Sequence, residues 1–494
     1  MNISIAALVQ RSLLNLAGIL IILGIVPPAS ALIFGSEWGI PELVFSPPQG
    51  EKTNELWVIR DDADRIYLWW NLFPVENEEA RDTVRPAVIH AQWTNGRWQG
   101  PNDILVWPGG GRLTSTVIDD VGRLHAFSAT DCISYSHAMW YEALSAQNWS
   151  ERQCIDGTGL TNPSASVSPD GIIFVAYADA GTKALRLIKS TNNGKSWSIV
   201  STIDETIDGF LNDPALTVDD KGRLHLVWSV GSPPSSYPPL GVYYSRSDNG
   251  GENWKLPIQL SGTDEGEPAI AVHDDEIHVL WNGDVKKGGR YYRYSKDAGD
   301  YWELTETLSP QASAGGQGGL QRPPAIITDS TGTVHVLLHE QEALYYMAKV
   351  GTVWTDKELM FTSSDFNSRE IREPRMAITN GNQLHAFYII IPYARLPDED
   401  AVNNISRVYH QFRMIDAPQE DPTPISIPAS PESTTTFAPT EVIRTPTFQA
   451  TSDGLSQNSE NSIEASNPGY ILILSASIVI IFISLVLIYS WLRH

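Results

Sequence analysis

Three short segments share one template, and this internal repeat constrains the fold more than any other feature of the chain. Residues 190–197, 247–254 and 295–302 all read S-x-[D/N]-x-G-x-x-W. Their starting positions are separated by 57 (247 − 190) and 48 (295 − 247) residues. Each copy lies between runs that are rich in β-branched and aromatic residues, as strands are. Internal repeats of this period are typical of propellers and solenoids.

The template has the composition of a tight turn between two strands. Its Asp or Asn hydrogen-bonds the backbone two residues on, its Gly supplies a positive φ, and its Ser bonds locally. The Trp that follows supplies a large apolar plug. We therefore expect a structural role for these positions. They are Ser190, Asn192, Gly194 and Trp197, then Ser247, Asn249, Gly251 and Trp254, then Ser295, Asp297, Gly299 and Trp302.

A second template accompanies these turns: a polar residue, often Pro, a short apolar strand, a turn and a second apolar strand. The clear copies begin at Asp213, Glu267, Arg322 and Glu373, weaker copies begin at Thr114 and Asn162, and the first unit covers residues 56–70. Each unit supplies four short strands, which make one propeller blade. We expect an all-β fold, a β-propeller of four-stranded blades, with seven blades favoured and six as the alternative.

The N-terminal part of the propeller is expected to close the ring. Residues 36–45 resemble the outermost strand of a unit, as a comparison with residues 253–260 indicates. The last unit lacks such a strand, because the sequence becomes rich in Pro soon after residues 405–412. We predict that the N-terminal strand completes the last blade and covers its edge.

The turn template resembles the Asp-box of the sialidase (neuraminidase) superfamily, also called the BNR repeat. The resemblance covers residues 35–415 and implies a propeller in which the boxes are structural turns far from the catalytic centre. Sialidases of this family usually have six blades, so seven would be a departure. The family's early F/Y-R-I-P motif is also missing, since residues 39–41 keep only its last part and lack the Arg.

Two apolar segments lie outside the repeats. Residues 1–31 look like a secretory signal peptide with an A-x-A cleavage site at residues 29–31, and an uncleaved anchor is the alternative. Residues 470–491 carry no charge over 22 positions, enough to span a bilayer. We predict a signal peptide (1–31), a propeller (32–415), a disordered Pro/Ser/Thr-rich stalk (416–468), a transmembrane helix (469–492) and a cytoplasmic tail (493–494). The propeller would then lie at the cell surface.

Charge and cysteine content exclude some functions. The net charge of −24 argues against nucleic acid as a partner, because binding to it needs a basic face. Cys132 and Cys154 are the two cysteines, and in an oxidising compartment we expect them to form one disulfide. No Cys/His spacing suggests zinc, so we expect neither a metal nor a cofactor. The His residues that recur in the second strands, such as His225, are expected to pack between blades or to cap strands.

The candidate site is the mouth of the central channel, where the innermost strands of a propeller begin. A mixed ring of cations and carboxylates occupies that repeated position. Its members are Arg112, Asn162, Asp213, Glu267, Arg322 and Glu373, with Arg372 and Arg375 beside the last. Salt bridges around the channel mouth are the structural explanation, and ligand binding is the functional one.

The resemblance implies roles for an active sialidase. Arginines would clamp the carboxylate of the substrate, and a Tyr nucleophile would be activated by a Glu. The candidates are Arg112, Arg322 and Arg372 or Arg375 for the clamp, Glu267 or Glu373 for the base, Asp82 for the acid, and Tyr237 or Tyr393 for the nucleophile.

Three functions are compatible with this pattern. The favoured one is a membrane-anchored extracellular propeller without catalysis, which recognises a glycan or a surface protein through the channel mouth. The first alternative is an exo-sialidase-type glycoside hydrolase, and the second is a structural subunit of a cell-envelope complex. The missing arginine motif and the blade count favour recognition over catalysis.

Overall fold

The structure is a computed structural model that describes most of the repeat region. The described residues are 37–48, 51–74, 87–106, 112–119, 122–129, 133–139, 153–155, 160–179, 184–204, 209–232, 239–283, 288–310, 323–340, 343–362, 365, 368–392 and 406–423. The predicted signal peptide, the predicted transmembrane helix, the tail and the stalk from residue 424 lie outside them. Among the described residues, no helix has the length and apolar character needed to cross a membrane.

The described residues form seven antiparallel sheets, each named here by its innermost strand. The first three are the β2 sheet (β2 Glu51–Arg60, β3 Ile66–Pro74, β4 Ala87–Thr94, β5 Arg97–Val106), the β6 sheet (β6 Arg112–Ile118, β7 Arg123–Ala129, β8 Ile133–Met139, β9 Gln153–Cys154) and the β10 sheet (β10 Leu160–Val167, β11 Ile173–Asp179, β12 Ala184–Ser190, β13 Ser198–Asp204).

The other four sheets follow in chain order. They are the β14 sheet (β14 Phe210–Val218, β15 Leu224–Gly231, β16 Pro239–Ser247, β17 Ile258–Gln259), the β18 sheet (β18 Glu265–His273, β19 Glu276–Gly283, β20 Arg290–Ser295, β21 Glu306–Ser309), the β22 sheet (β22 Ala325–Thr328, β23 Val334–Glu340, β24 Ala343–Val350, β25 Val353–Trp354, β26 Glu358–Thr362) and the β27 sheet (β27 Ser368–Thr379, β28 Gln383–Pro392, β29 Arg407–Met414, β1 Glu42–Phe45).

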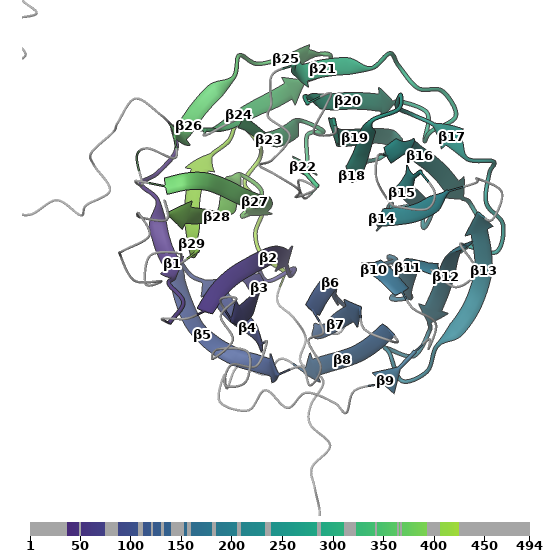
Figure 1. The fold of residues 1–494 in the computed structure, drawn as a ribbon, viewed down its shortest axis with the longest axis horizontal. Coiled ribbons are helices and arrows are strands. Elements are labelled where there is room, and N and C mark those ends of the chain that lie inside the picture. The colour runs from purple at the N-terminus through teal and green to yellow at the C-terminus, as the bar shows by residue number, and fades with distance from the viewer. Residues whose placement is uncertain are drawn as a thin grey trace, which may run out of the picture. The chain divides into compact units, whose positions relative to one another are not determined.

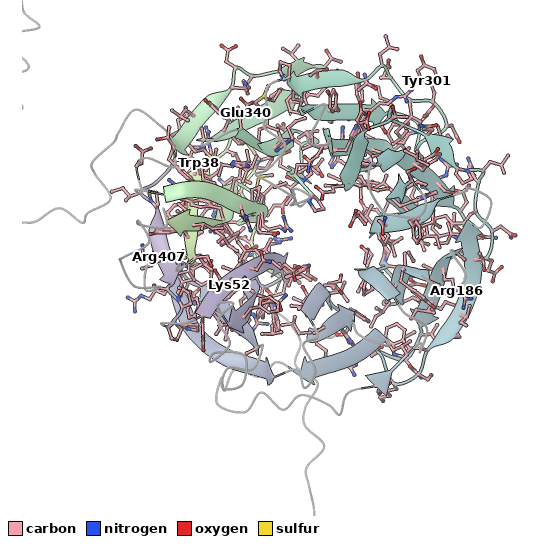
Figure 2. The ribbon with its side chains drawn as sticks, viewed as in Figure 1. Trp38, Lys52, Arg186, Tyr301, Glu340 and Arg407 are labelled. Atoms are coloured by element: carbon pink, nitrogen blue, oxygen red, sulfur yellow. The ribbon has the colours of Figure 1, made fainter. Side chains whose placement is uncertain are left out.

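The sheets are arranged in a closed ring (Figure 1). Their innermost strands contact one another in the order β2, β6, β10, β14, β18, β22 and β27, and β27 contacts β2 again. Side chains fill the space between neighbouring sheets, while Tyr301 points to the outside of the ring (Figure 2). The expected all-β, propeller-type fold is confirmed.

Both ends of the repeat region meet in the β27 sheet, where β1 pairs with β29. Glu42 lies opposite His410, and the Gly39 amide donates a hydrogen bond to the Phe412 carbonyl at 3.0 Å. The sheet therefore combines three strands from the end of the repeat region with one from its beginning. This pairing confirms the predicted closing strand, and it covers the edge of β29.

The chain continues across the junction of the first and last sheets after β29. The amides of Ile415, Glu420 and Thr423 donate to the carbonyls of Asn382, Asn380 and Asp62, at 2.9, 3.0 and 2.7 Å. These bonds hold the chain on the propeller as far as residue 423, which is eight residues into the segment predicted as stalk (416–423).

The three S-x-[D/N]-x-G-x-x-W segments form one and the same hydrogen-bonded turn. The Ser hydroxyl accepts the amide of the Gly four residues on, at 2.9 Å in the first two copies and 2.8 Å in the third. The Asn or Asp oxygen accepts the amide four residues further on, at 2.8–3.0 Å. A Cβ on Gly299 would lie 2.2 Å from the Tyr244 hydroxyl, so the close approach requires glycine there.

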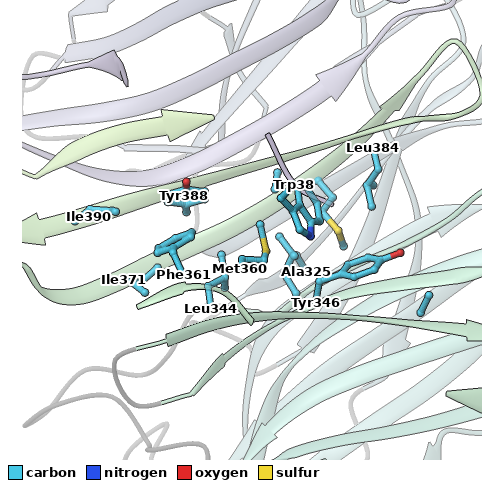
Figure 3. Close-up of a cluster of buried hydrophobic side chains, with 14 residues drawn as sticks. Trp38, Ala325, Leu344, Tyr346, Met360, Phe361, Ile371, Leu384, Tyr388 and Ile390 are labelled. Atoms are coloured by element: carbon cyan, nitrogen blue, oxygen red, sulfur yellow. The ribbon is translucent and has the colours of Figure 1, made fainter. Parts of the chain in front are cut away.

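The Trp that ends each turn packs onto the preceding sheet. Trp302 lies edge-on to Tyr244 of the β14 sheet, with 4.8 Å between the ring centroids. The same arrangement recurs at Trp197 of the first box and at Trp98, Trp354 and Trp38, where the sequence has no box. Trp98 packs on Phe387, Trp197 on Phe127, Trp354 on Tyr292 and Trp38 on Tyr346, with centroid separations of 6.1, 5.7, 5.0 and 5.4 Å. Figure 3 shows Trp38 and Tyr346 in the cluster between the β22 and β27 sheets.

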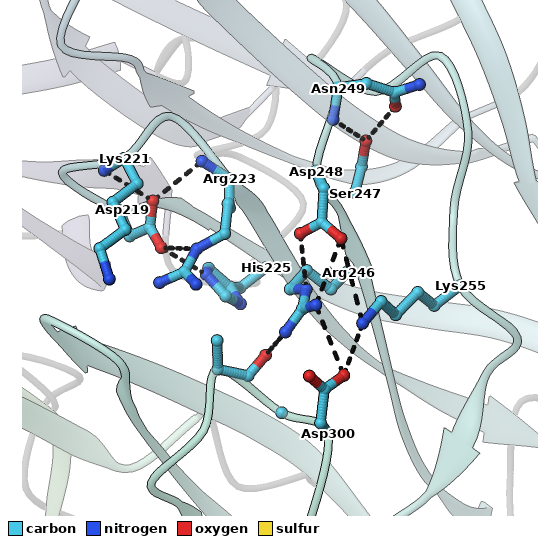
Figure 4. A network of polar contacts seen from close by, with 12 residues as sticks. Asp219, Lys221, Arg223, His225, Arg246, Ser247, Asp248, Asn249, Lys255 and Asp300 are labelled. Atoms are coloured by element: carbon cyan, nitrogen blue, oxygen red, sulfur yellow. Dashed lines mark hydrogen bonds and ion pairs between the residues drawn. The ribbon is translucent and has the colours of Figure 1, made fainter.

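The recurring His residues of the second strands link parts of one sheet. His225 is fully buried, and its Nε2 lies 3.1 Å from the Asp219 carboxylate at the preceding turn. Its Nδ1 lies 2.9 Å from the Tyr244 hydroxyl. Burial raises the pKa of Asp219, but the bonds from His225 and Arg223 outweigh it, so this pKa is lowered overall. His335 makes the same two contacts, and Figure 4 shows the network around His225.

A stability test follows from the packing of Trp302, which is 5% exposed. We expect Trp302→Ala to reduce the free energy of unfolding by about 3–5 kcal/mol, because it leaves a cavity between two sheets. Leu304→Ala is the matched control, since Leu304 is 85% exposed, and it should change that free energy by less than about 0.5 kcal/mol. Urea denaturation of both variants measures this. Equal stabilities would show that Trp302 does not bridge the sheets.

The buried imidazoles predict a pH dependence of stability. Burial lowers the pKa of His90 and of His278 to about 3, and it also lowers the pKa of His385. Below the unfolded value of 6.5, the unfolded chain therefore binds more protons than the folded one. The stability that these groups contribute is present above pH 6.5 and is lost as the pH falls towards the folded values.

We therefore expect the melting temperature to fall steadily from pH 7 to pH 4. His90→Phe keeps the ring stacking against Tyr67 and cannot take up a proton. This variant should reduce the slope of the free energy of unfolding against pH by up to about 1.4 kcal/mol per pH unit. Calorimetric melts at several pH values measure the slope, and an unchanged slope in this variant would contradict the assignment.

Candidate functional site

The innermost strands share a β-bulge near their beginning. Pairing with the second strand shifts register at the same level in six sheets. The shifts lie between Asn54 and Leu56, Leu113 and Ser115, Thr161 and Ser164, Asn212 and Ala215, Gly266 and Ala269, and Arg372 and Arg375. A bulge redirects side chains, and here every bulge lies at the same end of the ring. We call this end the bulge mouth.

Acidic residues occupy four of the bulges in a costly backbone conformation. Glu55, Asp213, Glu267 and Glu373 have φ values of 60°, 49°, 54° and 54°. Residues other than glycine rarely adopt this left-handed region. Three of the four are followed by Pro, which disfavours the α region for the residue before it. A strained conformation that recurs at one mouth points to a functional site.

A cavity of about 350 Å³ opens among these bulges, and we call it the mouth cavity. Its polar lining includes Glu55, Asp213, Glu373 and Arg375, and much of its wall consists of proline rings with Trp57 and Met376. The prolines are Pro163, Pro214, Pro268, Pro323 and Pro324. The volume lies within the range of small-molecule sites, and rigid rings keep the wall preformed.

Arg375 ties together three sheets at the mouth. Its Nη2 pairs with the Glu373 carboxylate at 3.1 Å, and its Nε donates to the Leu56 carbonyl of the β2 sheet at 3.0 Å. Its Nη1 donates to the carbonyls of Pro374 and Pro323, at 2.8 and 3.3 Å. This guanidinium therefore holds the seam of the ring in addition to lining the cavity.

Glu267 lies behind the cavity wall. Among the described residues its bulge contributes Pro268 to the lining, while Glu267 itself is buried. Asn282 Nδ2 donates to Glu267 Oε2 at 3.0 Å, and the Glu267 amide donates to Ser229 Oγ at 2.7 Å. Burial lowers the pKa of the Arg290 guanidinium to about 10, although the charges of Glu267 and Glu340 act to raise it.

The other predicted residues are placed only in part. Arg112 begins β6 opposite Ala129, so that Thr114 stands at its bulge, and Asn162 lies within the bulge of β10. Arg372 precedes its bulge and is exposed. Asp82, Arg322, Tyr237, Tyr393 and Cys132 lie outside the described residues. The arginine clamp, the nucleophile and the disulfide of Cys132 with Cys154 therefore stay predictions.

Sequence reasoning missed Glu55, its hydrogen-bond partner Asn71 on β3, and Asn282, which donates to Glu267. Glu55 lacks the following Pro that marked the other copies, although it directly precedes the apolar strand of its unit. Each of the two asparagines directly follows a Trp of an apolar second strand, at Trp70-Asn71 of β3 and Trp281-Asn282 of β19. That shared pattern was the available signal.

The opposite end of the channel has a different character. A cavity of about 520 Å³ lies there, among the turns that join first and second strands, and its lining includes Asp219, His273, Asp274 and Asp329. The third box touches this end, where the Ala298 amide donates to the Asp275 carbonyl at 2.8 Å. The boxes thus lie away from the bulge mouth. Within the described part of the chain, no group of three His, Cys, Asp or Glu side chains could hold a metal.

Sequence similarity to a known protein covers part of the chain. No protein-family model matches the chain. A curated protein named sialidase from Bacteroides fragilis (strain YCH46) is 29% identical over 133 residues, which cover 26% of this chain and 24% of that protein. This match supports the resemblance to the sialidase superfamily over that part of the chain. The match spans about a quarter of the relative's length, so the activity of that protein is not carried over.

Several solved structures are similar to this chain. The NanB sialidase of Streptococcus pneumoniae has a TM-score of 0.43 and 11% identity, with 78% of this chain and 72% of that chain covered. The polysaccharide lyase Uly1 has a TM-score of 0.46 and 13% identity, covering 78% and 94%. A protein of unknown function from Dyadobacter fermentans has a TM-score of 0.45 and 12% identity, covering 76% and 99%.

A double-mutant cycle tests the tie at the mouth. We expect Arg375→Met to reduce the free energy of unfolding by about 3–5 kcal/mol, because it removes the guanidinium that pairs with the buried Glu373 carboxylate and with the backbone of the neighbouring sheets. Adding Glu373→Gln should recover part of this loss, with a coupling energy of about 1 kcal/mol or more. Chemical denaturation of both single variants and the double variant gives the cycle. Additive effects would mean that the pair does not stabilise the ring.

Proposed function

We propose that the protein is a membrane-anchored extracellular propeller that recognises a carbohydrate at the bulge mouth. This proposal rests on the mouth cavity, which combines buried carboxylates with a rigid wall of prolines. A surface protein is the alternative ligand at the same mouth. The anchor is the predicted helix 469–492, and the predicted signal peptide puts the propeller outside the cell.

The architecture proposed for this protein is a seven-bladed propeller. The seven described sheets, their ring of contacts and the pairing of β1 with β29 support this count. Six of the seven described sheets contribute a bulge to one mouth, so the size and chemistry of that mouth depend on the number of sheets in the ring.

The chemistry of the mouth suits a neutral sugar. Carboxylate oxygens only accept hydrogen bonds, and sugar hydroxyls can donate them. Glu55, Asp213 and Glu373 supply such acceptors from three different sheets. The proline rings and Trp57 provide apolar surface for the faces of a sugar ring. Both kinds of contact are therefore available within one cavity.

An exo-sialidase is the second candidate, and the similarity to a curated sialidase favours it. Such an enzyme must bind the carboxylate of its substrate through arginines. Arg375 is the described guanidinium that lines the cavity, and it pairs with Glu373 and with backbone carbonyls. The predicted partners Arg112 and Arg322 would have to complete the clamp.

The decisive experiment uses the full chain in detergent on a glycan array, beside a fluorogenic sialoside assay. We expect one class of neutral saccharide to bind and the sialoside to stay intact. Glu373→Gln should weaken binding at least about tenfold, because it removes a charged acceptor. Asp297→Asn is the matched control, since it makes the same change in a turn whose two sister copies already carry Asn.

Each outcome decides between the candidates. Sialoside turnover that depends on Glu373 would establish the second candidate. Wild-type affinity in Glu373→Gln would place the ligand elsewhere on the propeller. A folded protein that binds no saccharide would overturn carbohydrate recognition and direct the search to protein ligands.

A further inference from the structure

The Glu55 carboxylate is held by a buried amide. Asn71 Nδ2 donates to Glu55 Oε2 at 2.7 Å, and both side chains are 2% exposed. Glu55 lies in the bulge of β2 and lines the mouth cavity, whereas Asn71 lies on the neighbouring strand β3, opposite Asn54. The contact therefore joins a cavity residue to the rigid second strand behind it.

A second sheet repeats the arrangement with its own residues. In the β18 sheet, Asn282 donates to Glu267 at 3.0 Å, and its position opposite Gly266 matches that of Asn71 opposite Asn54. Ser229 occupies the same level of the β14 sheet, opposite Asn212, and accepts the Glu267 amide. A polar second-strand residue that holds a bulge is thus a recurring feature of the ring.

We propose that Asn71 is a positioning residue, which orients the Glu55 carboxylate as the acceptor for a ligand hydroxyl in the mouth cavity. This inference rests on the proposed carbohydrate recognition. An amide N–H donor fixes one carboxylate oxygen without adding charge, so the carboxylate keeps its acceptor strength. Preorganised acceptors lower the cost of binding, because no side chain has to be ordered by the ligand.

Asn71 also has a structural contact, which the test must separate from positioning. Its Oδ1 accepts the Leu113 amide of the β6 sheet at 3.3 Å, and its Nδ2 donates to the Leu113 carbonyl at 3.4 Å, a weaker contact that Asn71→Asp also removes. Asn71→Asp keeps an acceptor for that amide, loses the donor to Glu55 and adds a second carboxylate beside it. Two adjacent carboxylates hold one proton more tightly than either does alone, so their shared pKa rises. At low pH the shared proton restores a donor between the two side chains.

The experiment measures saccharide binding to the full chain in detergent by titration calorimetry between pH 5 and 8. Lactose, chitotriose and sialyllactose are the probes. For the best-bound probe, we expect Asn71→Asp to weaken binding at least about tenfold at pH 8 and to recover affinity towards pH 5. The wild type should vary less over this window, although Asp213, Glu373 and Arg375 also face the cavity.

Two further variants keep the test decisive. Asn192→Asp makes the same substitution at a box where Asp297 shows that Asp is accepted, and it should bind like the wild type. Glu55→Gln keeps the shape of the side chain and should lose affinity at every pH while its melting temperature changes little. If Asn71→Asp does not fold, Glu55→Gln alone decides whether Glu55 contacts the ligand.

The outcomes separate the inference from the proposed function. Binding by the wild type together with full affinity in Asn71→Asp and in Glu55→Gln would overturn the positioning role and leave carbohydrate recognition standing. A loss that does not recover at low pH would make Asn71 a purely structural residue. Failure of the wild type to bind any of the three probes would overturn both ideas.

Discussion

The pairing of β1 with β29 is the interaction on which the rest of the structure depends. A ring of sheets is complete only when its last sheet contacts its first, and here that last sheet needs a strand from the other end of the repeat region. Because residues far apart in sequence must meet, the ring gains this stability only when most of the chain has folded. The bonds of residues 415–423 and of Thr53 with Ser406 add to the same seam.

The aromatic plugs explain how unlike sheets can follow one another around the ring. Each Trp packs on an aromatic or apolar side chain of the preceding sheet, so that one contact geometry is repeated with different sequences around it. Trp354 and Trp38 show that the plug is kept where the box is lost. The hydrogen-bonded turn and the plug are therefore separate devices, since the turn orients a strand end and the plug joins two sheets.

The bulge mouth contains features that reduce the stability of the fold. Residues other than glycine in the left-handed region and buried carboxylates both cost free energy. Both features occur at equivalent places in several sheets of the ring. The structure offsets that cost locally through Asn71, Asn282 and Arg375, each of which binds a bulge carboxylate. Strain, burial and a cavity coincide at one end of the channel, which is why we place ligand recognition there.

The sequence by itself determined the kind of fold, because turn and strand patterns are local. Ser, Asn or Asp, Gly and Trp at fixed spacing specify a turn through bonds within eight residues, and the repeat of such units indicates a propeller. The same local comparison identified the closing strand from its likeness to residues 253–260. It also brought Asp213, Glu267 and Glu373 to one level, because the units are equivalent.

Only the tertiary structure decided what each mouth residue does. Glu55 and Glu373 come from opposite ends of the repeat region and line the same cavity near the seam. Pro268 lines that cavity in place of Glu267, whose side chain binds Asn282 instead. The role of Arg375 depends on carbonyls of three sheets, which no pattern within one unit can specify. Equivalent positions in a repeat have the same backbone conformation. The hydrogen-bond partners of their side chains, however, come from the neighbouring sheet. At the seam, ring closure decides which sheet that neighbour is.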